Sequence, residues 1–279
     1  MSDTLSTIRA ALPKFRSSEK KVADCVLKDP DSVIMSSITE LAEKSATSEP
    51  TVIRFCRKLG LRGYLELKLN LARDLPSSQY IHENVKEGDT VPEIFNKLFN
   101  SAKEAFNDTL NHLDLNMLER AVEALNSANR IEFYGQGGSA VVARDAHHKF
   151  FRLGIPCIAY DDPHMQVMSA ALLSPNDVVV AVSHTGSTKD ILESVKIAKA
   201  AGATIIGIVS QENSPLSRLC DIAIRIRSQE AALRLAPMTS RLIQLAIIDI
   251  LFVAMAMKNF PKTRDRLDKV KRSLVDKRY

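Results

Sequence analysis

The apolar positions of residues 1–75 recur at the spacing of helices. The Ser-Ser-Glu sequence at residues 17–19 can cap one helix, which should end near Asp29-Pro30 because the residue before a proline resists the α region. Leucines spaced through residues 61–75 are broadly consistent with a further helix, and the polar stretch 76–89 is expected to be a linker. The pattern therefore predicts an all-α domain over residues 1–75.

Within this domain, the segment Ile38–Gly60 has the pattern of two short helices joined by a tight turn. Ser36 or Ser37 can cap the first helix, and Ser48 the second, which carries Pro50 in its first turn where a missing N–H costs nothing. The remaining expectations are Leu41 as a core residue, Ala42 at the crossing of the helices, Val52 and Phe55 facing inward, and Gly60 as the stop.

The second helix of this pair is expected to present a polar face. Thr51, Arg54, Arg57 and Lys58 are left outward by the inward positions. Arginines on an exposed helix suit guanine edges or phosphates in the major groove of DNA. A solvated amphipathic helix pair without a partner has the same spacing, so the pattern alone favours neither interpretation.

After residue 90 the chain is first helical and then alternates between strands and helices. Leu98, Ala102, Ala105 and Phe106 are expected on one apolar helix face, and Leu118, Val122 and Leu125 on another. The predicted strands are 131–134, 157–160, 178–182, 204–209 and 222–226, with helices at 140–153 and 187–201. Alternating strands and helices indicate βαβ units, so residues 90–279 are expected to form an α/β domain: a parallel-sheet, three-layer sandwich ending in a basic helix.

Charge is unevenly distributed over the 279 residues, whose net charge is +5. Residues 1–75 carry a net +3 and residues 258–279 a net +6, around an acidic middle. Basic ends suit a polyanion such as DNA, although a solvated charged surface explains the numbers equally well. The four scattered cysteines and the absence of a signal-like start predict a reduced, cytoplasmic protein. The apolar run Leu242–Met257 is short and interrupted by polar residues, so we expect a buried or interface helix and no membrane partner.

Two loops in the α/β region have the chemistry of anion sites. Gly135–Ser139 follows a strand and opens a helix, where glycines let the backbone approach an anion; alone, this is often just a tight turn. Ser183–Thr188 follows a buried strand and supplies four hydroxyls and a glycine before a helix, more than capping needs. It lacks the lysine of a nucleoside triphosphate loop. A phosphate cradle is therefore predicted there.

The quoted motifs resemble a known family. Leu41-Ala42, Ser48–Val52, Arg54–Arg57 and Gly60, followed by Gly63-Tyr64, resemble the N-terminal domain of the RpiR family of bacterial regulators, and the two loops resemble its sugar isomerase (SIS) domain. Thr47 departs from the apolar residue usual in the family. The resemblance spans nearly the whole chain. It implies DNA contacts from the second helix (Ser48, Glu49, Thr51, Arg54, Arg57, Lys58) and phosphosugar contacts from the loops (Gly137, Ser139, Ser183, His184, Thr185, Gly186, Ser187, Thr188).

Further strings, among them Lys149–Arg152, Gln166–Ser169 and Met238–Arg241, resemble a family member that regulates hexose metabolism. That resemblance implies an effector such as 2-keto-3-deoxy-6-phosphogluconate. Ser187 and the stretch 229–236 depart from that member, which leaves the sugar acid less certain than the fold.

The expected protein is thus a transcriptional regulator, a repressor relieved by its ligand. Its expected partners are a double-stranded DNA operator, a phosphosugar effector and further copies of itself in a homodimer or homotetramer. No cofactor and no metal is expected, since neighbouring His147 and His148 would diverge on a helix. The alternative is a sugar-phosphate isomerase, for which His184 and Glu193 are acid–base candidates near the hydroxyl loop in sequence.

Overall fold

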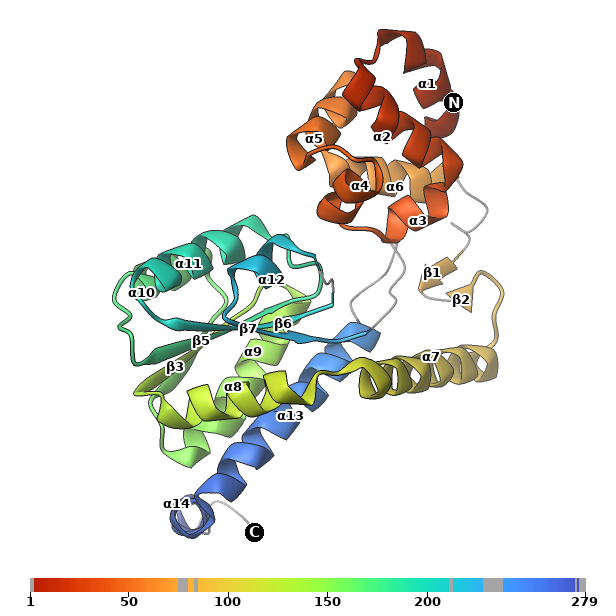
Figure 1. The fold of residues 1–279 in the computed structure, drawn as a ribbon. Coiled ribbons are helices and arrows are strands. Elements are labelled where there is room, and N and C mark those ends of the chain that lie inside the picture. Colours follow the sequence, from red (N-terminus) through yellow and green to blue (C-terminus); the bar gives the residue numbers. More distant parts are fainter. Residues whose placement is uncertain are drawn as a thin grey trace. The chain divides into compact units, whose positions relative to one another are not determined.

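A computed structural model describes residues 3–74, 80–82, 85–210, 213–227, 238–273 and 275. The chain divides into two compact units, the first running to Glu104 and the second beginning at Ala105. Figure 1 shows the elements of each unit. The division falls inside one helix, α7 (Val91–His112), so the domain boundaries expected from the sequence stay predictions.

The first unit begins with six helices, as the periodicity predicts. They are α1 (Thr4–Ala11), α2 (Ser17–Lys28), α3 (Pro30–Met35), α4 (Ile38–Lys44), α5 (Glu49–Lys58) and α6 (Tyr64–Asp74). Their apolar faces meet in one core that includes Leu41, Val52 and Phe55. The two short strands β1 (Tyr80–His82) and β2 (Val85–Lys86) then pair antiparallel within the stretch expected to be a linker.

Two details of the first unit refine the expected helix ends. α2 ends at Lys28, one residue before Asp29-Pro30, as predicted. Its cap differs, because Ser17 is already helical and the Glu19 carboxylate accepts a hydrogen bond from the Arg16 N–H at 2.7 Å. The expectation that residues 17–19 cap the helix is therefore right only for Glu19.

The second unit contains a five-stranded parallel sheet. In spatial order the strands are β4 (Cys157–Tyr160), β3 (Arg130–Tyr134), β5 (Asp177–Ser183), β6 (Thr204–Val209) and β7 (Ile222–Arg225). All four pairings are parallel. The helices are α8 (Leu115–Ser127), α9 (Gly138–Phe150), α10 (Pro163–Ala170), α11 (Lys189–Ala200), α12 (Pro215–Leu219), α13 (Thr239–Lys258) and α14 (Phe260–Arg272).

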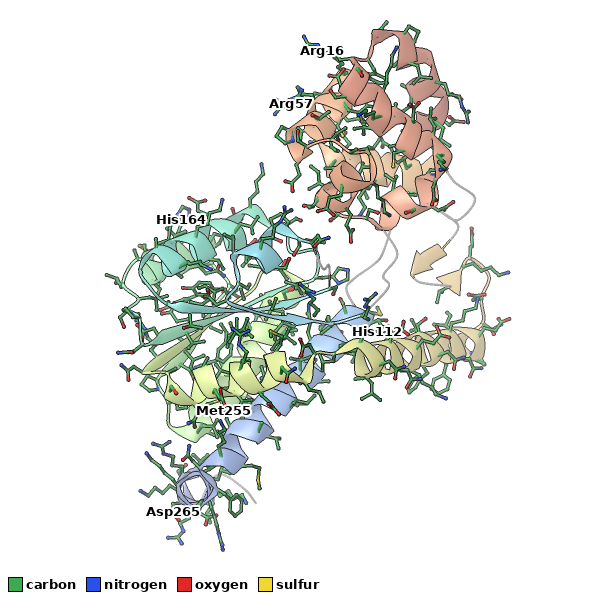
Figure 2. The ribbon with its side chains drawn as sticks, viewed as in Figure 1. Arg16, Arg57, His112, His164, Met255 and Asp265 are labelled. Carbon is green, nitrogen blue, oxygen red and sulfur yellow. The ribbon has the colours of Figure 1, made fainter. Side chains whose placement is uncertain are left out.

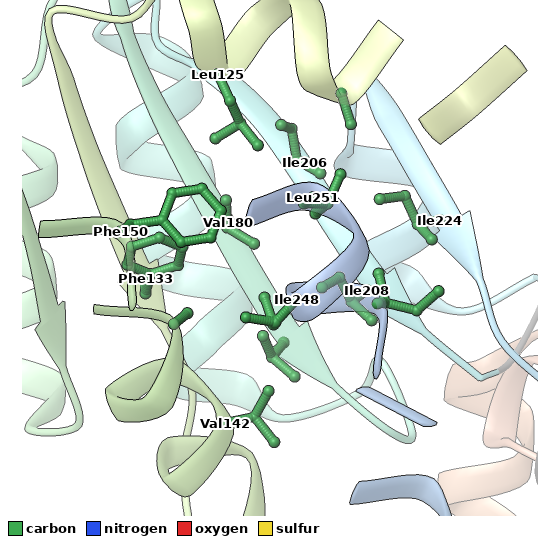
Figure 3. Packing of buried hydrophobic residues seen from close by; sticks show 14 of the residues in the cluster. Leu125, Phe133, Val142, Phe150, Val180, Ile206, Ile208, Ile224, Ile248 and Leu251 are labelled. Atoms are coloured by element: carbon green, nitrogen blue, oxygen red, sulfur yellow. The ribbon is translucent and has the colours of Figure 1, made fainter. Parts of the chain in front are cut away.

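The helices cover both faces of this sheet, which confirms the predicted three-layer sandwich (Figure 1). On one face α8, α9 and α13 pack against the sheet, and Figure 3 shows Phe150, Ile248 and Leu251 meeting the strand residue Val180 there. On the other face α10, α11 and α12 form a separate core with Ile205 of β6. Because β5 is buried at every position, its sequence is a continuous apolar run rather than an alternating one.

Of two apolar helices, α7 is turned from its expected orientation, and α13 (Thr239–Lys258) lies partly in the core as expected. Phe106 of α7 is 43% exposed, while Ala105 is buried, so the predicted apolar face is rotated away from Phe106. α13 extends over 20 residues with a mean hydropathy of 1.8, which by length and composition alone is enough to cross a membrane. One such helix is weak evidence for a membrane span, because core helices meet the same criterion; Ile247, Ile248 and Leu251 of α13 belong to the core described above.

Candidate functional site

The paired helices α4 and α5 are held by local hydrogen bonds that the sequence predicts in part. Ser37 is the cap of α4: its hydroxyl accepts from the Glu40 N–H at 3.0 Å, and the Glu40 carboxylate accepts from the Ser37 N–H at 2.7 Å. This reciprocal capping box satisfies two N–H groups that the first helical turn leaves open. Of the two expected caps, the structure selects Ser37, while the Ser36 hydroxyl donates to the Ser32 carbonyl.

The turn between α4 and α5 depends on one residue in a left-handed conformation. Ala46 has φ +48°, the only positive φ of a non-glycine residue in the part of the chain that the structure describes. The next residue closes the turn, because the Thr47 N–H donates to the Ala42 carbonyl at 2.8 Å. The Thr47 hydroxyl lies 2.9 Å from the Ser45 hydroxyl. The polar residue that departs from the family pattern is thus accommodated by a hydrogen bond inside the turn.

The outer face of α5 is basic. Arg54 and Arg57 are both exposed, and Figure 2 shows Arg57 extending away from the first unit. The Arg54 guanidinium donates to the Thr51 hydroxyl at 2.8 Å, which restricts its side chain. Two cations therefore project from one helix face, as expected.

Thr51 corrects one expectation. It was predicted to lie outward with the two arginines, yet it is 4% exposed. Its hydroxyl lies 3.0 Å from that of Ser48 and accepts from Arg54. At three residues from Arg54 it occupies the edge of the helix that turns toward the core, so its contacts are within the protein.

Lys58 is exposed but has partners inside the first unit. Its ammonium group lies 2.6 Å from the Glu19 carboxylate, which is 2% exposed. Burial raises the pKa of Glu19, but the hydrogen bonds from Lys58 and from the Arg16 N–H outweigh it, so the pKa is lowered overall. Lys58 therefore neutralises a buried carboxylate, whatever else it contacts.

Ser48 and Glu49 stand at the beginning of α5. Ser48 takes the N-cap position with an extended backbone, but its side chain makes no capping bond to an N–H group. The Glu49 carboxylate accepts from the Thr39 hydroxyl at 2.5 Å, which links α5 to α4. The N-cap expected from the sequence is thus in place, with the hydroxyl directed to Thr51 instead.

The two predicted anion loops lie at neighbouring strand ends. β3 pairs with β5, with Tyr134 opposite Ala181, so the turn that begins at Gly135 and the loop that begins at Ser183 leave the same edge of the sheet. The sheet grows from β3 toward β4 on one side and toward β5 on the other. The helices that follow β3 and β5, which are α9 and α11, pack on opposite faces of the sheet. Such a topological switch point is where open α/β sheets bind ligands.

The hydroxyl loop is shaped by its own first residue. Ser183 is 4% exposed, and its hydroxyl accepts from the Gly186 N–H at 3.1 Å. Thr185 is exposed, and the Ser187 hydroxyl donates to the Thr185 carbonyl at 3.2 Å. Thr188 takes the N-cap position of α11 without a side-chain capping bond. The Thr188 hydroxyl is therefore not used to cap the helix.

The glycine turn opens α9. Gly137 is the N-cap residue with φ +56°, and the Ser139 N–H donates to the Gln136 carbonyl at 3.1 Å. Ser139 is half-buried in the first turn of the helix. The Gln136 amide reaches across to the Asp190 carboxylate of α11 at 3.3 Å. The two loops are thus joined by a direct side-chain contact.

A third segment, which the sequence analysis did not identify, supports the hydroxyl loop. The His184 ring nitrogen Nδ1 lies 2.8 Å from the hydroxyl of Ser210, directly after β6. The Leu216 N–H donates to the Gly186 carbonyl at 2.9 Å. A Cβ atom on Gly186 would lie 2.2 Å from the Ser214 hydroxyl, so only glycine fits. The position of Ser210 at the carboxyl end of a strand was the available signal.

The remaining chemical candidates are a carboxylate that caps a helix and an exposed carboxylate. Asp162 accepts from the Met165 N–H at 2.8 Å and caps α10, with Pro163 in the first turn. Glu193 is exposed on α11. Among the described residues, no group of three or more His, Cys, Asp or Glu side chains could hold a metal ion.

The fold and these two sites define a class: a regulator with a helix-turn-helix domain and a parallel α/β ligand domain. Residues 2–78 match the helix-turn-helix domain of the rpiR family, and residues 124–254 match the SIS domain. A transcriptional regulator of Caldanaerobacter subterraneus subsp. tengcongensis is 41% identical, with 93% of each chain covered. The regulator HexR of Escherichia coli K12 is 40% identical over 99% of this chain and 95% of its own. This protein belongs to the RpiR family of helix-turn-helix transcriptional regulators.

A solved structure has the same fold along nearly the whole chain. The NanR protein of Vibrio vulnificus, in complex with ManNAc-6P, matches with a TM-score of 0.87 and 28% identity over 98% of both chains. The expected fold class is confirmed by this likeness and by the two matched domains.

Proposed function

We propose that this protein is a DNA-binding repressor of sugar-metabolism genes that a phosphorylated sugar or sugar acid releases from its operator. The observation that carries the proposal is the pairing of the hydroxyl loop with the glycine turn at the switch point of the sheet, in a chain whose other domain is a helix-turn-helix. The loop has no lysine or metal cluster that would suit a nucleotide, whereas serine and threonine hydroxyls suit a phosphate monoester.

For DNA, the proposal assigns base and phosphate contacts to the exposed start and outer face of α5. Arg54 and Arg57 carry the contacts, Ser48 and Glu49 lie at the end that enters the groove, and Lys58 adds charge near the backbone. Thr51 acts indirectly, because its buried hydroxyl orients the Arg54 guanidinium. The partner is a double-stranded operator.

For the ligand, the proposal assigns the phosphate to backbone N–H groups and hydroxyls of both loops. The contributing residues are Gly137, Ser139, Ser183, His184, Thr185, Gly186, Ser187 and Thr188. N–H groups at the start of α9 and α11 point toward the same edge and favour an anion. ManNAc-6P in the complex of NanR supports a sugar 6-phosphate as the ligand class. The sequence resemblance makes 2-keto-3-deoxy-6-phosphogluconate the first effector to test.

The assembly is proposed to be a homodimer or homotetramer, since operators of such regulators mirror the symmetry of the protein. The protein acts as a regulator without an enzymatic reaction, as the names of its relatives support. An isomerase would need an acid–base pair at the loop, and Glu193, the carboxylate expected for that role, is exposed on α11.

The test is selection of genomic DNA fragments by the purified protein, with and without 2-keto-3-deoxy-6-phosphogluconate. The proposal predicts that a small set of fragments is retained and that the sugar acid releases it. Retained fragments that are released only by another sugar phosphate keep the proposal and change the effector. Failure to retain any specific fragment in either condition would overturn the proposal, and turnover of a sugar phosphate would favour the isomerase.

A further inference from the structure

One buried amide touches three of the segments that surround the two loops. Gln166 of α10 is 0% exposed. Its Nε2 donates to the Tyr160 carbonyl at 2.6 Å and to the Gly135 carbonyl at 3.4 Å. Its Oε1 lies 3.5 Å from the Ser194 hydroxyl. Both donors and one acceptor position of the amide are thus used, the first in a short bond and the others in longer contacts.

The three contacted segments adjoin the edge of the sheet where the two loops lie. Gly135 begins the glycine turn, and Tyr160 is the last residue of β4, next to β3. Ser194 lies on α11, one turn beyond the residues that follow the hydroxyl loop. The Ser194 hydroxyl shares its single hydrogen with the Asp190 carbonyl at 2.9 Å, so its contact to Gln166 is the weakest of the three.

α10 is itself fixed to the sheet beside this contact. One turn after Gln166, the Ser169 hydroxyl donates to the buried Glu132 carboxylate of β3 at 2.6 Å. The Tyr134 hydroxyl donates to the other Glu132 oxygen at 2.6 Å. Arg130 lies 3.5 Å from the same carboxylate and balances its charge. The helix that carries Gln166 is therefore anchored to β3 through Ser169, independently of the two loops.

We propose that Gln166 is a positioning residue of the phosphosugar site. It fixes the glycine turn relative to α11, and so sets the separation of the two groups of N–H donors. The inference rests on the proposed function, because it deepens the account of the same site without adding a contact to the ligand. The turn lies close against the start of α9, since a Cβ atom on Gly135 would lie 2.5 Å from the Ser139 carbonyl oxygen. Preorganised donors bind an anion more tightly than mobile ones.

The variant Gln166→Leu tests this proposal, and the chain offers a matched control. Leucine fills most of the volume of glutamine but removes the amide that donates to the Tyr160 and Gly135 carbonyls. Gln244 of α13 is also a buried glutamine, 2% exposed, in the same unit, and its Nε2 has no hydrogen-bond partner among the residues that the structure describes. Gln244→Leu should therefore be neutral or stabilising, and it should leave the loops unchanged.

The first readout is amide hydrogen exchange of the full chain without ligand. In Gln166→Leu, exchange should accelerate in peptides covering residues 135–140 and 160–163, while peptides from β5 and β6 keep the wild-type rate. A uniform increase across the second unit would mean that Gln166 only stabilises the fold. Unchanged exchange would mean that Gln166 does not restrain the glycine turn. Either result overturns the proposal, and neither depends on knowing the effector.

The second readout is the affinity for 2-keto-3-deoxy-6-phosphogluconate, with inorganic phosphate as the minimal probe. Gln166→Leu should weaken binding roughly ten-fold, while Gln244→Leu binds as the wild type does. Wild-type affinity in the folded Gln166→Leu protein overturns the positioning role. If the wild type binds neither probe, the proposed effector chemistry fails, and hydrogen exchange alone decides the role of Gln166.

A folding failure of Gln166→Leu would not end the test. Ser194→Ala removes only the weakest of the three contacts. It should accelerate exchange in the same peptides, those covering residues 135–140 and 160–163, with smaller amplitude. An unchanged pattern in a stable Ser194→Ala protein, together with an unfolded Gln166→Leu protein, would assign Gln166 to stability alone.

Discussion

The side chains of α5 divide between supporting the first unit and facing outward. Spacing along the helix predicted that Val52 and Phe55 lie in the core and that Arg54 and Arg57 face outward, and both are confirmed. It also predicted an outward Thr51, which was wrong. Threonine at the edge of the buried face can lie on either side, and the hydroxyl contacts that draw it inward cannot be derived from periodicity.

Lys58 and Arg57 provide a matched pair of cations on the same helix. Lys58→Met leaves Glu19 buried without its cation, so we expect the free energy of unfolding to fall by about 1–3 kcal/mol at neutral pH. Arg57→Met should change stability little, because the side chain is exposed. Urea unfolding of the two variants measures the difference, and equal effects would contradict the role given to Lys58.

The loss in Lys58→Met should depend on pH with a definite sign. The folded pKa of Glu19 lies below its ordinary value of 4.5, so its stabilising contribution is present above 4.5 and is lost as pH falls through the folded pKa. Without Lys58, burial raises the pKa and the charged carboxylate destabilises the fold at neutral pH. Unfolding curves of the two proteins should converge on acidification, and a gap that widens toward low pH would exclude this cause.

Ala46 is the residue whose backbone is least suited to its side chain. Its φ of +48° lies in the left-handed region, which costs a residue with a Cβ atom roughly 1–2 kcal/mol. Glycine relieves this strain but gains freedom in the unfolded chain. We expect Ala46→Gly to stabilise the first unit by up to about 1 kcal/mol, measured by thermal unfolding. A loss of stability would show that the turn is not strained.

At the scale of elements, the sequence predicted which segments form strands and helices but not their order in space. Continuous apolar runs identified β5 and β6, and hydroxyls and glycines identified the loops that follow β3 and β5. That these loops are neighbours depends on β3 lying between β4 and β5, which no local pattern contains. The supports from Ser214 and Gln166 come from that order, so sequence reasoning could not find them, whereas Ser210 had a signal in its place directly after a predicted strand.

The hydroxyl loop should be more sensitive to a methyl group than the glycine turn. Gly186 and Gly137 both have positive φ, +60° and +56°. A Cβ atom on Gly186 would strike Ser214, whereas one on Gly137 meets nothing within 4 Å. Gly186→Ala should therefore abolish the effector response while operator binding remains. Gly137→Ala should reduce the response less, with a stability cost from its strain of roughly 1–2 kcal/mol. Equal responses in operator-binding assays would contradict this geometry of the loop.

At the scale of the whole molecule, the account requires two sites on one chain to be coupled. The helix pair belongs to the first unit and both loops to the second. Coupling between an effector site and a DNA site is typically about 1–3 kcal/mol, and it is reciprocal, since each ligand changes the affinity for the other by the same factor. Family membership supports the presence of both domains.

The DNA side of the coupling rests on the arginines of α5. Arg54→Ala should weaken operator binding by about 1–3 kcal/mol if it contacts a base, and it should leave the affinity for the sugar phosphate unchanged. Fluorescence anisotropy with a labelled operator fragment, and calorimetry with the sugar phosphate, measure the two affinities. Undiminished operator binding would remove α5 from the interface.

The most direct measurement is an operator titration at increasing 2-keto-3-deoxy-6-phosphogluconate, made with the wild type and with Ser183→Ala. The account predicts that the sugar acid lowers the operator affinity of the wild type by roughly 5–150-fold. It also predicts that operator DNA lowers the sugar acid affinity by the same factor, and that Ser183→Ala still binds the operator but no longer responds. An operator affinity that stays constant at saturating concentrations of this and every other sugar phosphate tested would contradict the account.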